Sequence, residues 1–553
     1  MEPAQTLNGN LFADMLRAGA FNLRTHKQAI NNLNVFPIPD GDTGDNMLLT
    51  IMGGIDMISG DTSSLAEVSR RAADGMLLSA RGNSGVILSQ LFDGIAEGFE
   101  SADETLDDDR KLGEAMRCGV QHAYSAVMEP TEGTILTVAR CASEYAAGRA
   151  TGDLEAYLDD LLDEAKRTLD RTPDMLPVLK KAGVVDSGGA GLIYILEGMR
   201  KAVKGEIDPE ADKPAAEKLT QDINLDLFTE DSILEYGYCT ELLLRLQKSK
   251  TDPAAFEVST ITDYLRRIGD SVVAFKTGSI VKIHVHTMTP DKVLGFCQMY
   301  GEFLKIKIEN MSLQHNNTAL DGIKVSVREE KECKQFGIVA VCAGKGIRQL
   351  FTDRGADVIV EGGQSMNPST EDFLNAFRQV SAKTILVLPN NANVILSAKQ
   401  AASLYTGADV RVLESKTIGE GYAALSMFDS NAESTDQLVQ ELNEAMLGVV
   451  TAEVSRCVRD AEMQDTQIHT GDYIGFVGKE LLAKADTRLG ALCATVDKLN
   501  VPAYDICLLI RGMEADQQEA REAETYIHSR YPGKEVYVID GLQEIYDYIL
   551  ILE

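Results

Sequence analysis

The chain contains 553 residues, 44% of them hydrophobic, and carries a formal net charge of −32 at pH 7. A chain of this length exceeds what one hydrophobic core supports, so we expect three or four domains. The negative charge argues against nucleic acid or an anionic membrane surface as a main partner. We also expect no transmembrane segment, because no run approaches the roughly 18 apolar residues that a spanning helix requires.

The cysteines and the N-terminal residues indicate a cytoplasmic location. Nine cysteines are scattered without a paired pattern, as expected of reduced thiols rather than of a disulfide framework. The first residues, Met-Glu-Pro-Ala-Gln-Thr, lack the basic and apolar regions of a signal peptide. The sequence does not fix the oligomeric state, and a homodimer is one candidate.

Three aspartates, two glycines and two prolines fall within residues 34–47. The prolines disfavour a helix, and the glycines allow a tight turn and close approach to a ligand. We therefore expect Asp40 and Asp42, with Asp45 as a third candidate, at a loop tip just before a helix that begins near residue 46. Carboxylates at this spacing suit Mg²⁺, which completes its coordination with phosphate oxygens and water. A solvated acidic turn is the alternative.

The sequence Asp-Gly-Asp-Thr-Gly-Asp-Asn-Met at 40–47 resembles the magnesium loop of the DAK2, or DhaL-like, nucleotide-binding domain. With the preceding Asn-Val-Phe-Pro-Ile-Pro, the later motifs and the total length, the chain resembles the ATP-binding subunits of bacterial fatty acid kinases. The resemblance implies Mg²⁺ on Asp40 and Asp42. A third metal-holding aspartate of the dihydroxyacetone kinases corresponds to Asn34 here. The resemblance also implies that ATP lies beside Asn34, Thr43 and Asn46.

Three later loops of small residues each precede a helical stretch, at 79–88, 132–138 and 185–192. Free N–H groups at a helix start favour anions, so the first loop is a candidate phosphate site, with ordinary helix capping by Ser84 as the alternative. The resemblance implies that all three loops lie beside ATP. It assigns to the nucleotide Asn83, Ser84, Gly85, Thr134, Asp186 and Gly188. For Thr134, capping of its helix is the alternative.

Residues 1–205 are predicted to be helical. Apolar side chains recur near every 3.6 residues over 9–33, and the stretches 46–59, 63–79 and 153–170 are also expected to be helices. The resemblance implies that the helices of this domain form an antiparallel eight-helix barrel with the ligand loops at one end. A charged, proline-containing linker follows at 206–222.

Residues 223–312 are predicted to form a ferredoxin-like α+β domain. The order βαββαβ is expected from strands at 238–246, 271–276, 279–287 and 304–311 and helices at 253–268 and 289–300. In that topology the first and third strands are antiparallel neighbours, so Cys239 lies level with His284 and His286. One thiolate and two imidazoles suit Zn²⁺, with the fourth position left to water, Glu241 or another domain. Packed strand residues without a metal are the alternative.

A second polar linker is expected at 313–334, followed by an α/β region at 335–553. A parallel sheet is predicted from short apolar strands, separated by helical stretches, at 337–342, 357–360, 384–388 and 409–413. A second half is expected to contain a helix at 435–460, strands near 473–477, 505–511 and 535–539, and a helix at 514–530. The region resembles the DegV-type fold of acyl-binding proteins, but residues 364–370 retain little of their acid-binding serine motif. We therefore expect a docking domain rather than a lipid carrier.

The motifs together predict a phosphotransferase that uses ATP and Mg²⁺, with Asp40 and Asp42 as the catalytic metal ligands. The resemblance implies the acceptor, a fatty acid carboxylate held by a separate DegV-type acyl-binding protein and converted to an acyl phosphate. Phosphoryl transfer chiefly requires positioning and charge neutralisation, and an ionised carboxylate acceptor needs no general base. Two alternatives remain: a dihydroxyacetone-type kinase acting on a small ketone, and a non-catalytic metal-binding scaffold or regulator.

Overall fold

The computed structural model divides the chain into two compact units, Met1–Pro214 with Lys331–Glu553, and Ala215–Glu330. The residues that it describes are 6–33, 41–58, 62–103, 105–127, 129–206, 238–252, 256–277, 280–310, 333–363, 367–464 and 466–553. The predicted linkers at 206–222 and 313–334 lie almost wholly outside these ranges.

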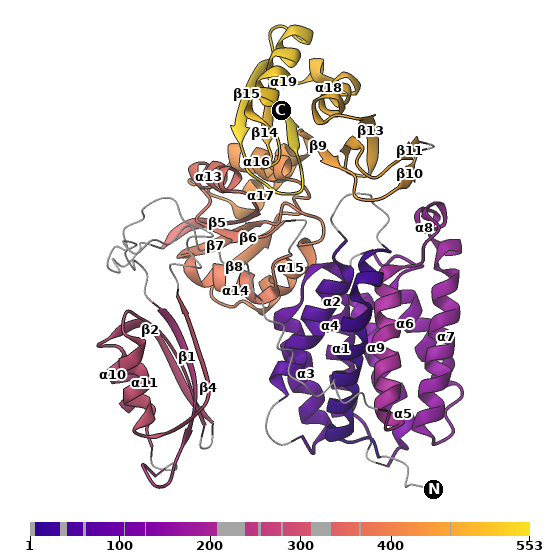
Figure 1. Ribbon diagram of the computed structural model, residues 1–553, viewed down its shortest axis with the longest axis vertical. Helices are drawn as coiled ribbons and strands as arrows, with labels where there is room; N and C mark the ends of the chain where they lie inside the picture. Colours follow the sequence, from indigo (N-terminus) through magenta and orange to yellow (C-terminus); the bar gives the residue numbers. More distant parts are fainter. Residues whose placement is uncertain are drawn as a thin grey trace. The chain divides into compact units, whose positions relative to one another are not determined.

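The N-terminal part of the first unit is built from helices. They are α1 (Gly9–Asn31), α2 (Thr43–Met57), α3 (Leu65–Ser79), α4 (Gly82–Glu100), α5 (Asp108–Ser125), α6 (Ile135–Ala147), α7 (Leu154–Met175), α8 (Pro177–Ala182) and α9 (Ser187–Val203). Each long helix packs on the next, and α9 packs on both α7 and α1, which brings the last helix back to the first (Figure 1). The apolar residues predicted to line the first helix, among them Phe12, Met15 and Leu16, are buried in the shared core.

Two glycines allow α1 and α9 to approach closely. A Cβ at Gly198 would lie 2.2 Å from the backbone oxygen of Ala18, and one at Gly19 would lie 3.0 Å from that of Ile195. Backbones this close leave no room for larger side chains. The contact therefore fixes the axis of α9, whose start carries the predicted nucleotide loop at 185–192.

The second unit contains the sheet predicted for the middle of the chain. Its elements follow the order βαββαβ: β1 (Tyr238–Leu246), α10 (Ser259–Leu265), β2 (Gly269–Thr277), β3 (Ile280–Thr287), α11 (Pro290–Gln298) and β4 (Gly301–Asn310). The sheet order is β2-β3-β1-β4 with antiparallel pairing, so the first and third strands are neighbours, as predicted. Alternate strand residues such as Leu242, Leu244 and Ile283 are buried in one core with residues of both helices.

The C-terminal part of the first unit begins with a parallel sheet. Its strands are β5 (Lys334–Cys342), β6 (Val358–Glu361), β7 (Ala382–Leu388) and β8 (Asp409–Val412), in the order β6-β5-β7-β8. The helices that follow the strands are α13 (Lys345–Asp353), α14 (Thr370–Gln379), α15 (Ile395–Leu404) and α16 (Ile418–Ser426). Every paired strand is parallel to its neighbour, as the alternation of short apolar strands and helices predicts.

A mixed six-stranded sheet completes this part, in the order β13-β12-β9-β16-β14-β15. Its strands are β9 (Val450–Arg456), β12 (Tyr473–Val477), β13 (Glu480–Ala485), β14 (Ile506–Arg511), β15 (Glu535–Asp540) and β16 (Tyr548–Leu552). The accompanying elements are α17 (Thr435–Leu447), α18 (Arg488–Lys498), α19 (Gln517–Arg530) and the small hairpin of β10 (Ala461–Met463) and β11 (Thr466–Ile468).

The prediction of one helix over 435–460 is wrong in its second part. The helix α17 ends at Leu447, and Gly448 is its C-cap. Three β-branched residues follow that glycine, and such residues favour a buried strand over a helix. They lead into β9, which lies between β12 and β16 inside the sheet.

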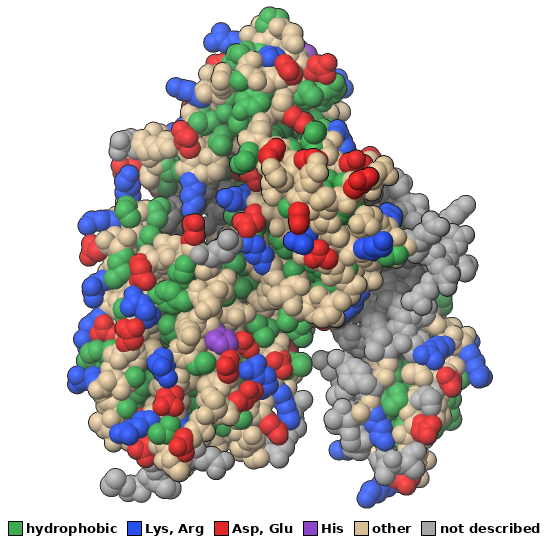
Figure 2. Space-filling view, turned by 180° about the vertical axis from the view of Figure 1, so that it is seen from behind, with side chains coloured by type: hydrophobic (Ala, Val, Ile, Leu, Met, Phe, Trp, Pro, Cys, Tyr) green, Lys and Arg blue, Asp and Glu red, His purple; other side chains and the backbone are tan. Residues whose placement is uncertain are grey.

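None of the helices that the structure describes is long and apolar enough to cross a membrane. On the face shown in Figure 2, acidic and basic side chains are interspersed over the described parts, without a continuous basic patch.

Candidate functional site

Three helices of the N-terminal part begin at one place. Thr43 opens α2 and Ser187 opens α9, and their hydroxyl oxygens lie 3.2 Å apart. Ile135 opens α6, and its backbone N–H donates to Asp186, the residue just before α9. The predicted loops at 132–138 and 185–192 are thereby brought beside the end of the acidic loop.

The start of α4 joins the same group of helix ends. Gly82, its first residue, has a φ of +57°, a conformation that favours glycine. A Cβ there would lie 2.5 Å from Nδ2 of Asn46 in the first turn of α2. We call the place formed by the first turns of α2, α4, α6 and α9 the helix-start site. Helix starts carry free N–H groups and a partial positive charge, so this site favours an anion such as phosphate.

Asp42 lies at the N-cap position of α2, at the edge of the helix-start site. Its side chain makes no capping hydrogen bond to the helix. Instead, the amide of Asn367 from the C-terminal part donates to Oδ2 of Asp42. The carboxylate is thus held by a residue from outside its own loop. Asp40 and Asn34, also assigned to metal and nucleotide, lie outside the described residues.

Asp45 differs from Asp42 because α1 engages both of its carboxylate oxygens. Nζ of Lys27 lies 3.0 Å from Oδ1, and Nδ2 of Asn31 donates to Oδ2 at 2.6 Å. Oδ1 of Asn31 accepts a hydrogen bond from the backbone N–H of Gly44 at 2.7 Å. Asp45 therefore ties the first turn of α2 to the end of α1, and its position in the loop has a structural explanation.

The residues predicted to hold phosphate, Asn83, Ser84 and Gly85, lie in the first turn of α4. Arg81 occupies the N-cap position, so Ser84 is within the helix and does not cap it. A Cβ at Gly85 would lie 2.4 Å from Oγ1 of Thr50, so only a glycine allows α4 this close to α2.

The C-terminal part contacts the helix-start site through residues that the sequence analysis did not single out. Nη1 of Arg81 donates to the backbone oxygen of Asn367 at 2.8 Å, and Nδ2 of Asn83 donates to Oδ1 of Asn393 at 3.3 Å. An isolated β-bridge also pairs Arg81 with Ser369. The Oδ1 atoms of Asn83 and Asn367 are buried without a hydrogen-bond partner among the described residues. Each unmet acceptor costs roughly 1–3 kcal/mol, so a ligand that brings hydrogen-bond donors is favoured here.

Asp186 is the N-cap of α9 and accepts a hydrogen bond from the backbone N–H of Gly189 at 2.7 Å. Burial raises the pKa of Asp186 to about 6, although hydrogen bonds from Gly189 and Ile135 oppose the shift. The carboxylate is thus largely ionised at neutral pH, and it lies where α6 and α9 begin.

Thr134 and Gly188 lie at the same contact between α6 and α9. Thr134 occupies the N-cap position of α6, but its hydroxyl donates to the backbone oxygen of Thr131 at 2.8 Å instead of capping the helix. A Cβ at Gly188 would lie 3.2 Å from Cβ of Ile135, so the two helix starts pack directly on one another.

Cys239, His284 and His286 of the second unit lie on neighbouring strands. In the register of β1 and β3, Cys239 pairs with His286 and Glu241 pairs with His284. Directly opposite residues of an antiparallel pair share a face of the sheet, as do residues two apart on a strand. The backbone therefore has the register that the predicted zinc site requires, and zinc binding itself stays a prediction.

Comparison with known families covers nearly all of the chain. A DAK2 domain model matches residues 37–201. Models of the middle and C-terminal domains of the FakA-like proteins, a family of fatty acid kinase subunits, match residues 235–318 and 337–553. Protein YloV of Bacillus subtilis is 38% identical over 99% of this chain and 100% of its own length. The uncharacterized protein SSP1546 of Staphylococcus saprophyticus is 36% identical over 99% of both chains.

Two solved structures are similar to part of the chain. One is the fatty acid kinase B3 protein of Streptococcus pneumoniae loaded with linoleic acid, at 13% identity and a TM-score of 0.30. The other is DegV, a fatty acid binding protein from Bacillus subtilis, at 13% identity and a TM-score of 0.31. Each alignment covers 40% of this chain and 99% of the other.

Proposed function

The chain belongs to the FakA-like family of fatty acid kinase proteins, and on that premise we propose that it is the ATP-dependent component of a fatty acid kinase. In the proposed reaction, the γ-phosphoryl group of ATP passes to a fatty acid carboxylate held by a separate DegV-type acyl-binding protein. The bond between the γ-phosphorus and its bridging oxygen breaks, and a bond from phosphorus to a carboxylate oxygen forms. The products are ADP and an acyl phosphate.

The convergence of four helix starts is the observation that carries this proposal. A triphosphate is strongly anionic, and the first turns of α2, α4, α6 and α9 present N–H groups and positive dipole ends to one place. Asp42 lies at its edge with its carboxylate held by Asn367. The unmet acceptors on Asn83 and Asn367 suit donors such as metal-bound water or a nucleotide amine.

The carboxylates of Asp40 and Asp42 would hold Mg²⁺ at this place. Bound there, the ion would supply charge neutralisation between phosphate oxygens. We assign contacts with ATP to Thr43 and Asn46 at the start of α2 and to Asn83, Ser84 and Gly85 at the start of α4. Asn34, Thr134, Asp186 and Gly188 complete the assigned set.

The domain division is proposed on the same basis. Residues 1–205 would be a DhaL-like helical barrel that binds ATP, residues 223–312 a ferredoxin-like domain with a zinc site, and residues 335–553 a DegV-like region. The contacts of Asn367 and Asn393 with the helix-start site support a docking role for the last region.

A coupled assay tests this function. The full-length protein would be incubated with ATP, Mg²⁺ and DegV-type proteins loaded with defined fatty acids, and acyl phosphate would be trapped as the hydroxamate. We expect acyl phosphate to form when the acid is bound to its carrier protein, and ADP to appear in an amount equal to the acyl phosphate. Phosphorylation of dihydroxyacetone instead would identify a small-ketone kinase, and a lack of nucleotide turnover with every acceptor would identify a scaffold or regulator.

A further inference from the structure

A second cluster of metal-binding side chains lies on α4 and α5, away from the helix-start site. Ligand atoms of Glu97, Cys118 and His122 all lie within 4.8 Å of one another. Cys118 and His122 are four residues apart on α5, and Asp93 and Glu97 are four apart on α4. Side chains at this spacing lie on one face of a helix, and these two faces meet where α4 packs on α5.

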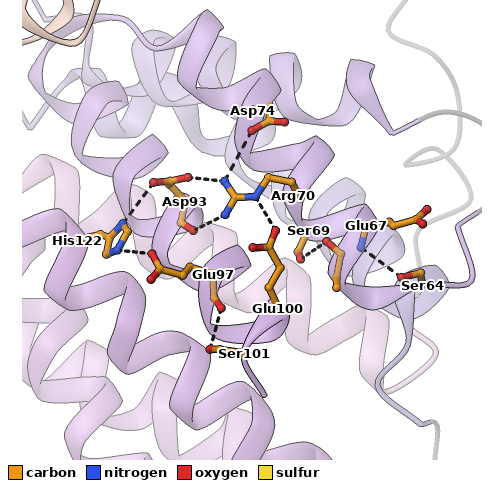
Figure 3. A network of polar contacts seen from close by, with 11 residues as sticks. Ser64, Glu67, Ser69, Arg70, Asp74, Asp93, Glu97, Glu100, Ser101 and His122 are labelled. Atoms are coloured by element: carbon orange, nitrogen blue, oxygen red, sulfur yellow. Dashed lines mark hydrogen bonds and ion pairs between the residues drawn. The ribbon is translucent and has the colours of Figure 1, made fainter. Parts of the chain in front are cut away.

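The ring of His122 is held between two carboxylates, as Figure 3 shows. Its Nδ1 lies 3.3 Å from Oδ2 of Asp93, and its Nε2 lies 2.8 Å from Oε2 of Glu97. Nη1 of Arg70 holds the other oxygen of Asp93 at 2.6 Å. Arg70 thus fixes Asp93, and Asp93 orients the ring so that Nε2 faces Glu97. A carboxylate on the far nitrogen is the usual support of a metal-binding histidine.

We propose that Glu97, Cys118 and His122 form a binding site for Zn²⁺ or a similar divalent transition metal, with Asp93 as the residue that positions His122. One thiolate, one imidazole and one carboxylate make a ligand set that zinc accepts, and water would fill the fourth position. In a tetrahedral site with bonds near 2.1 Å, the nitrogen and oxygen ligands lie roughly 3.4 Å apart. The present 2.8 Å contact between Nε2 of His122 and Oε2 of Glu97 therefore needs to open by about half an ångström.

The site is accessible. The side chain of Glu97 is 56% exposed and that of His122 is 29% exposed. A shallow pocket of about 390 Å³ is lined by both residues and by Cys118. A metal bound by the Cys118 thiolate would displace the thiol proton as it binds.

A bound ion would tie α4 to α5. The first turn of α4 carries Asn83 at the helix-start site, so the metal would stabilise the helix that presents this residue. The existence of the site does not depend on the proposed kinase activity, because none of its three ligands belongs to the helix-start site.

Titration of the metal-free, full-length protein with Co²⁺ tests the proposal. Co²⁺ substitutes for Zn²⁺, and a thiolate ligand gives a charge-transfer band in the near ultraviolet. Since the second unit has its own predicted site at Cys239, the readout is the difference between variants. We expect the wild type to bind one more Co²⁺ per chain than Cys118→Ser, with a stronger charge-transfer band. Cys141→Ser, on α6, is the matched control and should behave as the wild type does.

Glu97→Gln provides a second variant that is safe for the fold, because Glu97 is largely exposed. It should weaken Co²⁺ binding at this site at least tenfold while the melting temperature without metal stays near that of the wild type. Equal Co²⁺ stoichiometry and equal charge-transfer absorption in the wild type and in Cys118→Ser would overturn the proposal. Equal affinity in the wild type and in Glu97→Gln would remove Glu97 from the ligand set.

Discussion

The side-chain amide of Asn367 donates a hydrogen bond to the carboxylate of Asp42, across a sequence separation of 325 residues. Asn367 is 1% exposed, and its backbone oxygen accepts a hydrogen bond from Arg81. One residue of the C-terminal part thus contacts both the acidic loop and the start of α4. Under the proposed function, this relationship makes the C-terminal part a positioning element for the metal loop.

Replacement of Asn367 by alanine should therefore impair Mg²⁺-dependent turnover. The variant loses the donor that holds Asp42, and loss of such a support typically costs 10–100-fold in metal affinity or activity. Turnover measured across a range of Mg²⁺ concentrations should show a raised requirement for the ion. Asn375→Ala is the matched control, because Asn375 lies on α14, is exposed and bonds to Arg378. An unchanged Mg²⁺ dependence in Asn367→Ala would contradict the positioning role.

The two aspartates of the described loop should differ when each is replaced by alanine. Asp42→Ala should fold but lose phosphoryl transfer, because its carboxylate is a proposed Mg²⁺ ligand. Asp45→Ala should keep most of its turnover and lose about 1 kcal/mol of stability, because the ion pair between Asp45 and Lys27 is partly exposed to solvent. Circular dichroism and ATP turnover would be measured on both variants. Near-normal turnover in Asp42→Ala at ordinary Mg²⁺ would rule out the metal assignment.

The contrast between these aspartates marks the limit of the sequence analysis. The local pattern placed both in one acidic loop, and the strand at 238–246 and the parallel sheet were also predictable from local periodicity. The two aspartates differ in their partners: Asp42 bonds to Asn367, whereas Asp45 pairs with Lys27. Such pairings depend on tertiary packing. The same holds for the cluster on α4 and α5. The spacing of Cys118 and His122 is visible in the sequence, but Glu97 joins them only through helix packing.

The start of α4 should not tolerate a side chain at Gly82. Alanine there would adopt a left-handed φ, and its Cβ would lie 2.5 Å from Nδ2 of Asn46 and 3.1 Å from Nδ2 of Asn367. The backbone conformation alone costs about 1–2 kcal/mol. Gly183→Ala is the control, because Gly183 has a φ of +67° with no atom within 4 Å of its Cβ position. Denaturant unfolding should show a larger loss of stability in Gly82→Ala than in Gly183→Ala. Calorimetry should show weaker ATP binding in Gly82→Ala than in Gly183→Ala. Equal behaviour of the two variants would mean that crowding at the helix-start site has no effect.

Asp186 should make the free energy of unfolding depend on pH. Its pKa is about 6 in the folded protein, against an ordinary value of 3.8. The folded state holds the proton more tightly, so this group lowers stability as the pH rises from about 4 through about 6, by on the order of 3 kcal/mol. Asp186→Asn keeps an acceptor for Gly189 but does not ionise. The stability of this variant relative to the wild type should therefore increase between about pH 4.5 and 7, as measured by denaturant unfolding. If the difference in unfolding free energy between Asp186→Asn and the wild type stays constant with pH, the raised pKa of Asp186 is contradicted.

The predicted zinc site of the second unit involves two neighbouring strands, β1 and β3. The register of β1 and β3 sets Cys239 opposite His286, with His284 two residues away on the same strand. We expect the full-length protein to carry about one tightly held Zn²⁺ per chain at this site. The metal should be lost when both histidines are replaced by alanine, and binding should weaken below roughly pH 6 as the imidazoles protonate.

The measurement is elemental analysis of protein prepared without an affinity metal, in a Cys118→Ser background so that the cluster on α4 and α5 does not contribute. Because the ligands lie on two strands of one small sheet, metal removal should destabilise the second unit first. ATP binding should survive, because none of the residues assigned to ATP belongs to that unit. A metal-free protein of unchanged stability would mean that Cys239, His284 and His286 are ordinary strand residues.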